Sequence, residues 1–176
     1  MAYAAGVMLL SWHQGQLYTL VGKDQYNTYS DFGGKCDYSD KGNVIVTAAR
    51  EMYEEMCGCY LSITEVIHQL YNAPVIHTLS YTNKPYHMYL LFINYDEELC
   101  KRFDIINEFI RHTPCLGKFK EKTSIKWCLF SEVMSETVIL RNIFKRTMKY
   151  HKQAILINAY KYKTRNTKYN YGQRRS

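Results

Sequence analysis

The sequence lacks an apolar run that is long enough to cross a membrane. The apolar stretch nearest the N-terminus, Ala4 to Leu10, is far shorter than the roughly 20 residues of a membrane-spanning helix. No charged segment precedes it, so it does not have the pattern of a secretory signal peptide. We therefore expect a cytoplasmic protein with no membrane partner. The 176 residues predict one domain with at most a short appendage.

Paired cysteine motifs are also absent. None of the six cysteines belongs to a C-x-x-C pair, and neither they nor the histidines have the spacing of a zinc site. This pattern predicts free thiols in a reducing compartment. The cysteines are Cys36, Cys57, Cys59, Cys100, Cys115 and Cys128.

Acidic residues are missing from the C-terminal end of the chain. The segment from Arg141 to Ser176 contains eleven lysines and arginines but no aspartate or glutamate. The other 140 residues contain twelve basic and sixteen acidic residues, so the net charge of +7 comes from the C-terminal segment. Such an asymmetry of charge predicts contact with a polyanion.

The rest of the chain contains short apolar segments and two amphipathic ones. The first two strands should form a hairpin around the turn at Gln14 to Gln16. Asn43 is a suitable N-cap for a helix that ends near Met56, and Asp96 is one for a helix that ends before Pro114. The predicted strands are 4–12, 17–21, 75–81, 87–94 and 125–130, and the predicted helices are 43–56 and 97–111.

A last long helix is predicted to begin at Glu136, with Ser135 as its N-cap. We expect it to continue to Ala159, and we expect the chain after Lys161 to be disordered because it is rich in charged and polar residues. The residues expected to face inward are Val138, Ile139, Ile143 and Phe144.

Three glutamates lie close together in the helix that follows Asn43. Glu51, Glu54 and Glu55 stand at positions i, i+3 and i+4, so a helix places them on one face. Carboxylates this close repel one another unless a cation neutralises them, and Mg²⁺ is typically bound by one or two carboxylates together with substrate phosphates. A solvated acidic helix face is the alternative when the glutamates are considered alone. The residues on another face suit packing against a sheet: Ile45, Ala48, Ala49, Met52 and Met56.

The residues around the glutamates favour the metal site. The segment from Gly33 to Gly58 resembles the Nudix box, in which a glycine and a loop glutamate precede the sequence Arg-Glu-apolar-x-Glu-Glu-x-Gly. Asp40 stands in place of the loop glutamate, and the loop between it and the arginine is longer than in the family pattern. Cys57 stands in place of the helix-ending glycine, where Gly58 can supply the left-handed cap if the helix extends by one residue. The matching residues are Gly34, Arg50, Glu51, Met52, Glu54 and Glu55.

The resemblance implies an α+β Nudix fold, with a mixed β-sheet sandwiched between α-helices. It also implies hydrolysis of a phosphoanhydride bond in a nucleoside diphosphate linked to another group, with Mg²⁺ or Mn²⁺ as the cofactor. Lys23, Gly33 and Lys35 are the expected substrate-binding residues, and Glu121 is the candidate general base. A surface role is the alternative for Lys35 and for Glu121. The expected metal ligands are Glu51, Glu54, Glu55 and Gly34, and the expected catalytic residues are Arg50, Glu51, Glu54 and Glu121.

The resemblance implies a Nudix domain in residues 1–150, and the uneven charge indicates a basic, tyrosine-rich extension in residues 151–176. Basic residues that alternate with aromatic ones can follow phosphates and stack on unpaired bases, whereas the alternative is a solubilising tail. Trp12 and Trp127 are expected in the core rather than as stacking platforms. The expected RNA-binding residues are Lys149, Lys152, Lys161, Lys163 and Arg165.

If the extension binds RNA, the resemblance points to the mRNA-decapping Nudix enzymes, which cleave the 5′ cap to release m7GDP and a 5′-monophosphate RNA. Large DNA viruses encode compact enzymes of this kind, and the frequent Tyr, Lys, Asn and Ile are consistent with an AT-rich genome. Capped RNA is then the partner. The alternatives are a hydrolase of diphosphoinositol polyphosphates or (di)nucleoside polyphosphates, and a non-catalytic RNA-binding Nudix module. The intact glutamates argue against the last of these.

Overall fold

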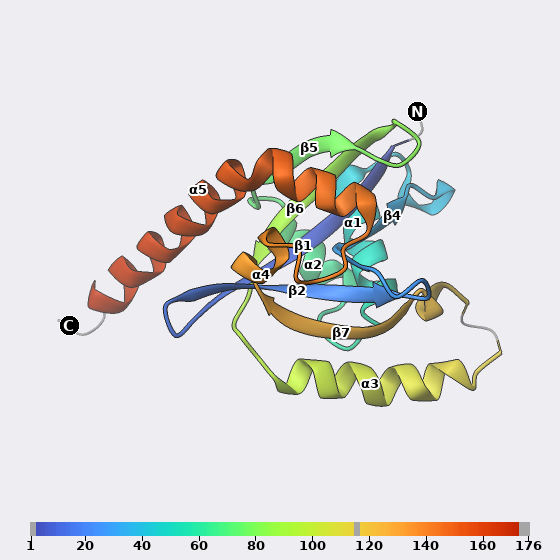
Figure 1. Ribbon diagram of the computed structural model, residues 1–176. Helices are drawn as coiled ribbons and strands as arrows, with labels where there is room; N and C mark the ends of the chain where they lie inside the picture. Colours follow the sequence, from blue (N-terminus) through green and yellow to red (C-terminus); the bar gives the residue numbers. More distant parts are fainter. Residues whose placement is uncertain (1–2, 115–116, 173–176) are drawn as a thin grey trace.

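A mixed β-sheet organises the molecule, and helices pack on both of its faces (Figure 1). The computed structural model describes residues 3–114 and 117–172, and the side chains of residues 3–114 and 117–165. The strand order is β3-β2-β1-β6-β5, with β4 paired to β1 and β7 paired to β2. The strands are β1 (Ala4–His13), β2 (Gln16–Asp24), β3 (Tyr29–Ser30), β4 (Phe32–Lys35), β5 (Val75–Leu79), β6 (Pro85–Phe92) and β7 (Lys122–Leu129). The helices are α1 (Val44–Glu55), α2 (Ile63–Leu70), α3 (Glu98–Arg111), α4 (Phe130–Met134) and α5 (Asn142–Gly172), with 3-10 helices η1 (Tyr38–Asp40) and η2 (Gly117–Lys120).

Strand β1 pairs with two different strands, β2 and β4, along one of its edges. It runs parallel to β6 on one side and antiparallel to both β2 and β4 on the other. The N-terminal half of β1 pairs with β4, where Gly6 is opposite Gly33, and the C-terminal half pairs with β2, where Leu9 is opposite Leu20. This division leaves β4 beside the N-terminal half of β1, and α1 contacts both strands.

The apolar run of β1 is buried on both faces of the sheet. Val7 and Leu9 pack in a cluster with residues of α1, α2 and α3, whereas Met8 and Leu10 pack in a second cluster with residues of α4 and α5. Alternate side chains of a strand point to opposite faces, so each face needs its own cover. The prediction of a buried first strand is therefore confirmed, and the two helical layers follow from it.

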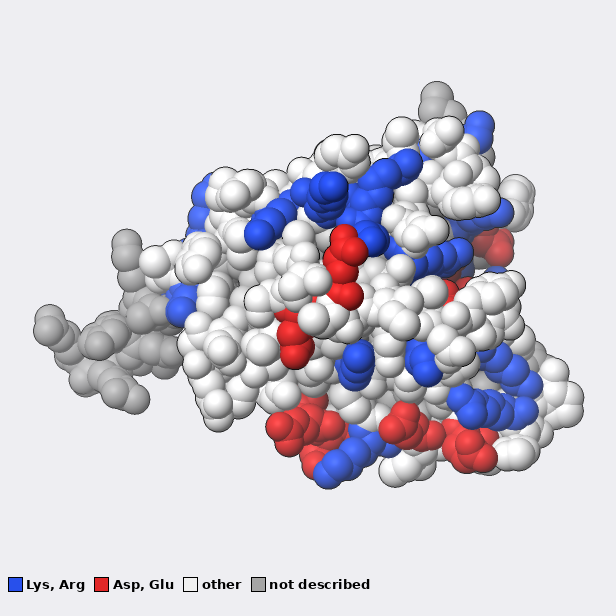
Figure 2. Space-filling model, viewed as in Figure 1, with Lys and Arg blue, Asp and Glu red and all other residues white. Residues whose placement is uncertain are grey.

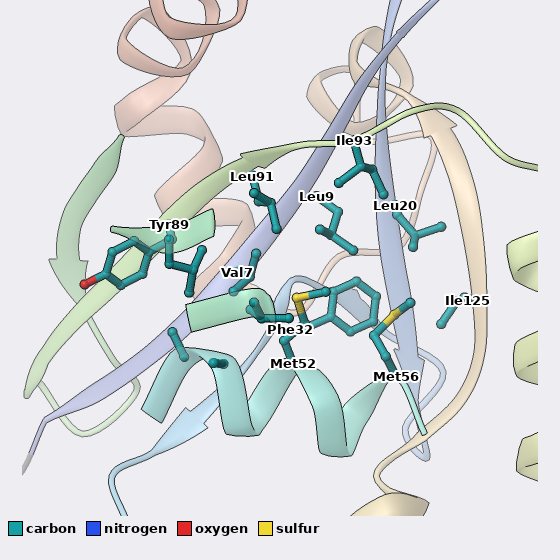
Figure 3. Close-up of a cluster of buried hydrophobic side chains, with 14 of the residues drawn as sticks. Val7, Leu9, Leu20, Phe32, Met52, Met56, Tyr89, Leu91, Ile93 and Ile125 are labelled. Carbon is teal, nitrogen blue, oxygen red and sulfur yellow. The ribbon is translucent and has the colours of Figure 1, made fainter. Parts of the chain in front are cut away.

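Helix α1 packs on the first face through the side predicted from its periodicity. Figure 3 shows Met52 and Met56 directed at Phe32 and at strand residues such as Leu20. Both methionines are about 1% exposed, and complete burial of a side chain of this type contributes about 1.5–3 kcal/mol. The core contact therefore fixes which side of α1 faces β4.

Both ends of α1 are closed by local hydrogen bonds. The side chain of Asn43 accepts hydrogen bonds from two first-turn amides at 3.0 and 3.4 Å, as predicted for an N-cap. At the other end, Cys57 N donates to Glu54 O at 3.1 Å and Gly58 N donates to Tyr53 O at 2.8 Å. Cys57 itself adopts the left-handed conformation, with φ 53°. The helix therefore does not extend by the additional residue that would make Gly58 its first left-handed residue. The long-range core contacts offset the cost of about 1–2 kcal/mol for a side chain there.

Helix α2 was not predicted. It begins after Ser62, whose hydroxyl accepts a hydrogen bond from Glu65 N at 3.3 Å while the Glu65 carboxylate accepts one from Ser62 N at 2.9 Å. This reciprocal capping box is written in the sequence as Ser-x-x-Glu, so a local signal for the helix was present. Val66 and Leu70 are its buried residues, and they join the α1 cluster.

The predicted start of the last helix at Glu136 is wrong. Ser135 instead ends α4, Glu136 has a φ of 62°, and α5 begins at Asn142. The segment between the two helices runs beside β3, where Tyr29 N donates to the carbonyl of Ile139 at 2.9 Å. Ile139, which was expected to face inward, is 70% exposed. A backbone pairing across more than 100 residues has overridden a local helix signal.

The predicted disorder after Lys161 is also wrong for the described residues, because α5 continues to Gly172. Contacts with the sheet hold this part of the helix: the Trp12 indole donates to the Ala159 carbonyl at 3.0 Å, and the Tyr162 ring stacks on Phe92 at 4.4 Å. The helix also passes the expected domain boundary between residues 150 and 151 without a break.

The described residues contain neither a helix that could span a membrane nor a disulfide bond. Of the helices in residues 3–114 and 117–172, none combines the length and apolarity required to cross a bilayer. The five described cysteines form no disulfide bond with one another, and Cys115 lies outside the described residues.

Candidate metal-binding and catalytic site

The glutamates of α1 lie against β4 at the edge of the sheet. Glu51 is 9% exposed and Glu55 only 3%, while Glu54 is half-buried on the outer side. Carboxylates are almost never buried to this degree without partners. The acidic face of α1 is therefore not a solvated surface, and the groups that contact it define the site.

Arg50 is the first of these groups. Its Nε and Nη2 donate to the two oxygens of Asp40 at 2.8 and 3.0 Å, and its Nη1 lies 2.9 Å from the carboxylates of both Glu51 and Glu54. Although burial opposes the shift, hydrogen bonds from Arg50, the Asp37 backbone and a neighbouring threonine lower the pKa of Asp40. The Asp40 side chain is thus the buried anchor of the arginine.

The carboxylates of Glu55 and Glu51 lie against Gly33 and Gly34, two adjacent glycines of β4. Gly33 N donates to Glu55 Oε2 at 2.7 Å. A Cβ at Gly34 would lie 2.5 to 2.7 Å from the three carboxyl atoms of Glu51, closer than real Cβ contacts. Gly34 therefore has no room for a side chain because the Glu51 carboxylate lies against its backbone.

Lys122 is a buried cation that the sequence analysis missed. It is 2% exposed, and its Nζ lies 2.8 Å from Ser30 Oγ and 3.3 Å from Glu55 Oε1. It is separated from Glu55 by 67 residues of sequence, so no local spacing could reveal the pair. Lys118 of η2 adds a second, exposed cation, whose Nζ lies 3.9 Å from Glu54 Oε1. Together with Arg50, these lysines surround the acidic turn with positive charge.

A further buried carboxylate, that of Asp31, lies beside this cluster. Tyr86 Oη donates to Asp31 Oδ2 at 2.6 Å, and burial raises the pKa of Asp31. The hydroxyl of Tyr86 packs against the backbones of Gly6 and Gly33, where a Cβ at either glycine would overlap it. The Tyr86 hydroxyl therefore lies against the same glycine whose N–H donates to Glu55.

The cations do not fully offset the burial of the glutamates. Burial raises the pKa of Glu51 to about 7 and that of Glu55 to about 8, although Arg50 and Lys122 act in the opposite direction. The charge of Glu121, an exposed residue between η2 and β7, adds to both shifts. The structure therefore places the predicted general base within electrostatic range of the two glutamates, and its catalytic role stays a prediction.

The fold of the chain is similar to those of several solved structures. A Caenorhabditis elegans Ap4A hydrolase in a binary complex matches with a TM-score of 0.53 and 13% identity, over 89% of this chain and 98% of that one. The Nudix domain of Shewanella oneidensis NrtR, complexed with ADP ribose, matches with a TM-score of 0.54 and 13% identity, over 87% of each chain. RenU, a Nudix hydrolase from M. smegmatis, matches with a TM-score of 0.50 and 12% identity, over 88% of this chain and 86% of that one. The chain has the Nudix fold.

No protein-family model matches the sequence, and a search of curated proteins finds no match. The α+β architecture expected from the Nudix box, a mixed sheet between helices, is confirmed. At these identities the similarity establishes the fold alone.

The donor set of α1 fits a hard divalent cation. Carboxylate oxygens are the ligands that Mg²⁺ and Mn²⁺ prefer, and a cation would relieve the burial of Glu51 and Glu55. Among the described residues the carboxylates do not yet converge on one point, and Arg50 Nη1 instead bridges Glu51 and Glu54. Asp40 binds the other two nitrogens of the guanidinium, Nε and Nη2.

The predicted substrate lysines lie on strands next to the site. Lys35 ends β4 and is exposed, and its carbonyl accepts a hydrogen bond from Arg50 Nη2 at 2.9 Å. Lys23 lies near the end of β2, paired with Tyr29 on one side and Ser124 on the other. The roles of both lysines, like the predicted roles of Gly34 and Glu121, stay predictions.

The structure does not bring the predicted RNA-binding residues to the acidic turn. Helix α5 packs on the face of the sheet opposite α1. Figure 2 shows lysines and arginines gathered over the part of α5 that crosses the sheet. The predicted residues are exposed except for Lys163, which is half-buried: Lys149, Lys152, Lys161, Lys163 and Arg165.

Proposed function

We propose that the protein is a divalent-metal-dependent Nudix hydrolase that cleaves a phosphoanhydride bond in a nucleoside diphosphate linked to another group. The observation that carries this proposal is the buried acidic turn of α1, where Glu51, Glu54 and Glu55 lie beside the glycines of β4. A pure binding module has no need for carboxylates that repel one another in a buried position.

The residues of the site divide the work. Glu51 and Glu55 would hold the cation, with Glu54 as a further ligand, and the bound cation would neutralise the phosphates and lower the pKa of an attacking water. Arg50, anchored on Asp40, directs the carboxylates at its Nη1. Glu121 would accept the proton of that water as the general base.

For the substrate we propose capped RNA, whose cap would be cleaved to m7GDP and 5′-monophosphate RNA. The support is the basic C-terminal segment, which has no acidic residue and whose exposed cations along the described part of α5 include Lys149, Lys152, Lys161 and Arg165. In this proposal residues 1–150 form the hydrolase and residues 151–176 the RNA-binding extension. The absence of a disulfide bond among the described cysteines is consistent with a cytoplasmic location, in a host cell if the gene is viral.

A dinucleoside polyphosphate is the second candidate substrate. The observation that favours it is the position of the basic helix, because α5 lies on the sheet face opposite the acidic turn and a small substrate does not need it. The similarity to the C. elegans Ap4A hydrolase fits this alternative. A diphosphoinositol polyphosphate, which is equally anionic, belongs to the same test.

The deciding experiment offers four substrates to the protein with Mg²⁺ or Mn²⁺: cap-labelled RNA, free cap dinucleotide, Ap4A and a diphosphoinositol polyphosphate. Release of m7GDP that is much faster from RNA than from the dinucleotide supports decapping. Cleavage of Ap4A or of the inositol compound alone rejects it. Loss of every activity in Glu51→Gln, with wild-type thermal stability, assigns the reaction to this site.

The general base has its own test. Glu121→Gln should lower kcat strongly while the Mg²⁺ concentration for half-maximal thermal stabilisation stays near that of the wild type. Unchanged turnover removes Glu121 from the mechanism.

A further inference from the structure

A cleft lies between α4, α5 and the turn that joins β1 to β2. It has a volume of about 520 Å³, and its wall combines aromatic, aliphatic and basic side chains. None of the described residues that line it is acidic. Its aromatic, aliphatic and basic lining residues include Trp12, Leu17, Phe130, Lys152, Leu156 and Tyr160.

Two aromatic rings form one side of the cleft. The rings of Trp12 and Tyr160 are 5.3 Å apart and tilted by 50°, and the hydrogen bond from the Trp12 indole to the Ala159 carbonyl fixes the tryptophan. Tyr160 is 58% exposed, unlike Tyr162, whose half-buried ring stacks on the half-buried Phe92. Tyr160 therefore offers a ring face to a ligand, and Trp12, which was expected in the core, forms the wall beside it.

Positive charge accompanies these rings. Lys152 lines the cleft and is exposed, and Lys163 Nζ lies 4.1 Å from the centre of the Trp12 ring. The two acidic residues nearby in sequence are already engaged: the Glu132 carboxylate accepts the Leu129 N–H at 2.9 Å, and Glu136 pairs with a lysine of α5 at 2.6 Å. The cleft thus combines a ring face with a cation and suits an aromatic anion.

We propose that this cleft binds one unpaired nucleotide of single-stranded RNA, with the base against Tyr160 and Trp12 and the phosphate near Lys152. Stacking of a base on an aromatic side chain is worth about 1–3 kcal/mol and accepts every base. The inference rests on the proposed function, because it assumes that RNA is the substrate. It adds where the body of that RNA is held.

The position of the cleft separates it from the acidic turn. Trp12 lies six residues along β1 from Gly6, the residue opposite Gly33, and a strand rises by about 3.3 Å per residue, so the two sites are about 20 Å apart along β1. A cap dinucleotide held at the acidic turn does not reach the cleft. An RNA of several nucleotides does, which explains how a basic helix on the far face of the sheet can serve the reaction.

The binding test uses uncapped single-stranded RNA in EDTA, so that hydrolysis plays no part. Tyr160→Ala should weaken binding on the order of tenfold, whereas Tyr150→Ala, which removes an exposed ring of the same helix outside the cleft, should change it by less than about twofold. Lys152→Ala should reduce the slope of log affinity against log salt by about one. In a Trp127→Phe background Trp12 is the sole tryptophan, and RNA should quench its fluorescence.

Three results would overturn the proposal: equal losses in Tyr160→Ala and Tyr150→Ala, duplex RNA that binds as tightly as single-stranded RNA, or fluorescence that RNA leaves unchanged. A parallel assay with Mg²⁺ compares capped RNA with cap dinucleotide, and Tyr160→Ala should raise KM for the first only. If no substrate is cleaved but RNA still binds in the cleft, the proposed function fails and the cleft stands. If cleavage occurs and the cleft variants bind RNA normally, the cleft fails alone.

Discussion

Gly34→Ala tests whether the contact between β4 and Glu51 is a requirement of the metal site. The added Cβ would lie 2.5 Å from Glu51 Oε2 and 2.7 Å from Oε1, whereas favourable contacts of carbon atoms begin at about 3.5 Å. The carboxylate must therefore move by about 1 Å, since Gly34 belongs to a strand paired with β1. A displacement of this size at a reacting centre costs about 100-fold in rate, or about 2.7 kcal/mol.

The assay measures two quantities in the wild type and in Gly34→Ala. The first is kcat/KM on the substrate that the four-substrate experiment identifies. The second is the rise in Tm with Mg²⁺, which for the wild type at a hundred times the Kd corresponds to about 2.7 kcal/mol, or about 5–10 °C. We expect the variant to lose about 100-fold in the first and most of the second.

Gly117→Ala is the matched control, because a Cβ at that exposed glycine meets no atom within 4 Å. It should leave both quantities at the wild-type values. Wild-type kcat/KM together with a wild-type Mg²⁺ response in Gly34→Ala would refute the reasoning, since the Glu51 carboxylate would then not need its place against β4.

Three further changes probe the groups around the acidic turn and the unpredicted helix. Lys122→Met leaves Glu55 buried without its cation and should lower the free energy of unfolding in urea by about 3 kcal/mol. Adding Glu55→Gln should recover part of this loss, whereas additive losses in the double variant would contradict a direct pair. Arg50→Lys cannot bind Asp40 with two parallel hydrogen bonds, so thermal unfolding should show a loss of about 2 kcal/mol, and a Tm equal to the wild type would count against the anchor. Ser62→Ala removes the N-cap of α2 and should lower the stability by about 1 kcal/mol, seen as a Tm lower by about 2–4 °C; an unchanged Tm would mean that packing alone holds this helix.

The site shows where sequence reasoning succeeds. The N-cap Asn43 and the spacing of Glu51, Glu54 and Glu55 act within one or two turns of a helix, and the structure forms that helix as predicted. The face that carries Met52 is likewise set by periodicity. These features depend on hydrogen bonds and packing directions that the nearest residues decide, so they can be read without knowing the fold.

The sequence alone therefore determined α1, the order of its charges and the strands β1, β2, β5, β6 and β7, but not β3 or β4. Only the tertiary structure decided which groups meet those charges: Lys122 reaches Glu55 from 67 residues away, and Tyr86 reaches Asp31 from 55. It also decided that Glu136 begins no helix, because the chain there pairs with Tyr29 instead. The physical reason is that a local pattern fixes φ and ψ over a few residues, whereas burial and charge pairing depend on neighbours that only the closed sheet brings together.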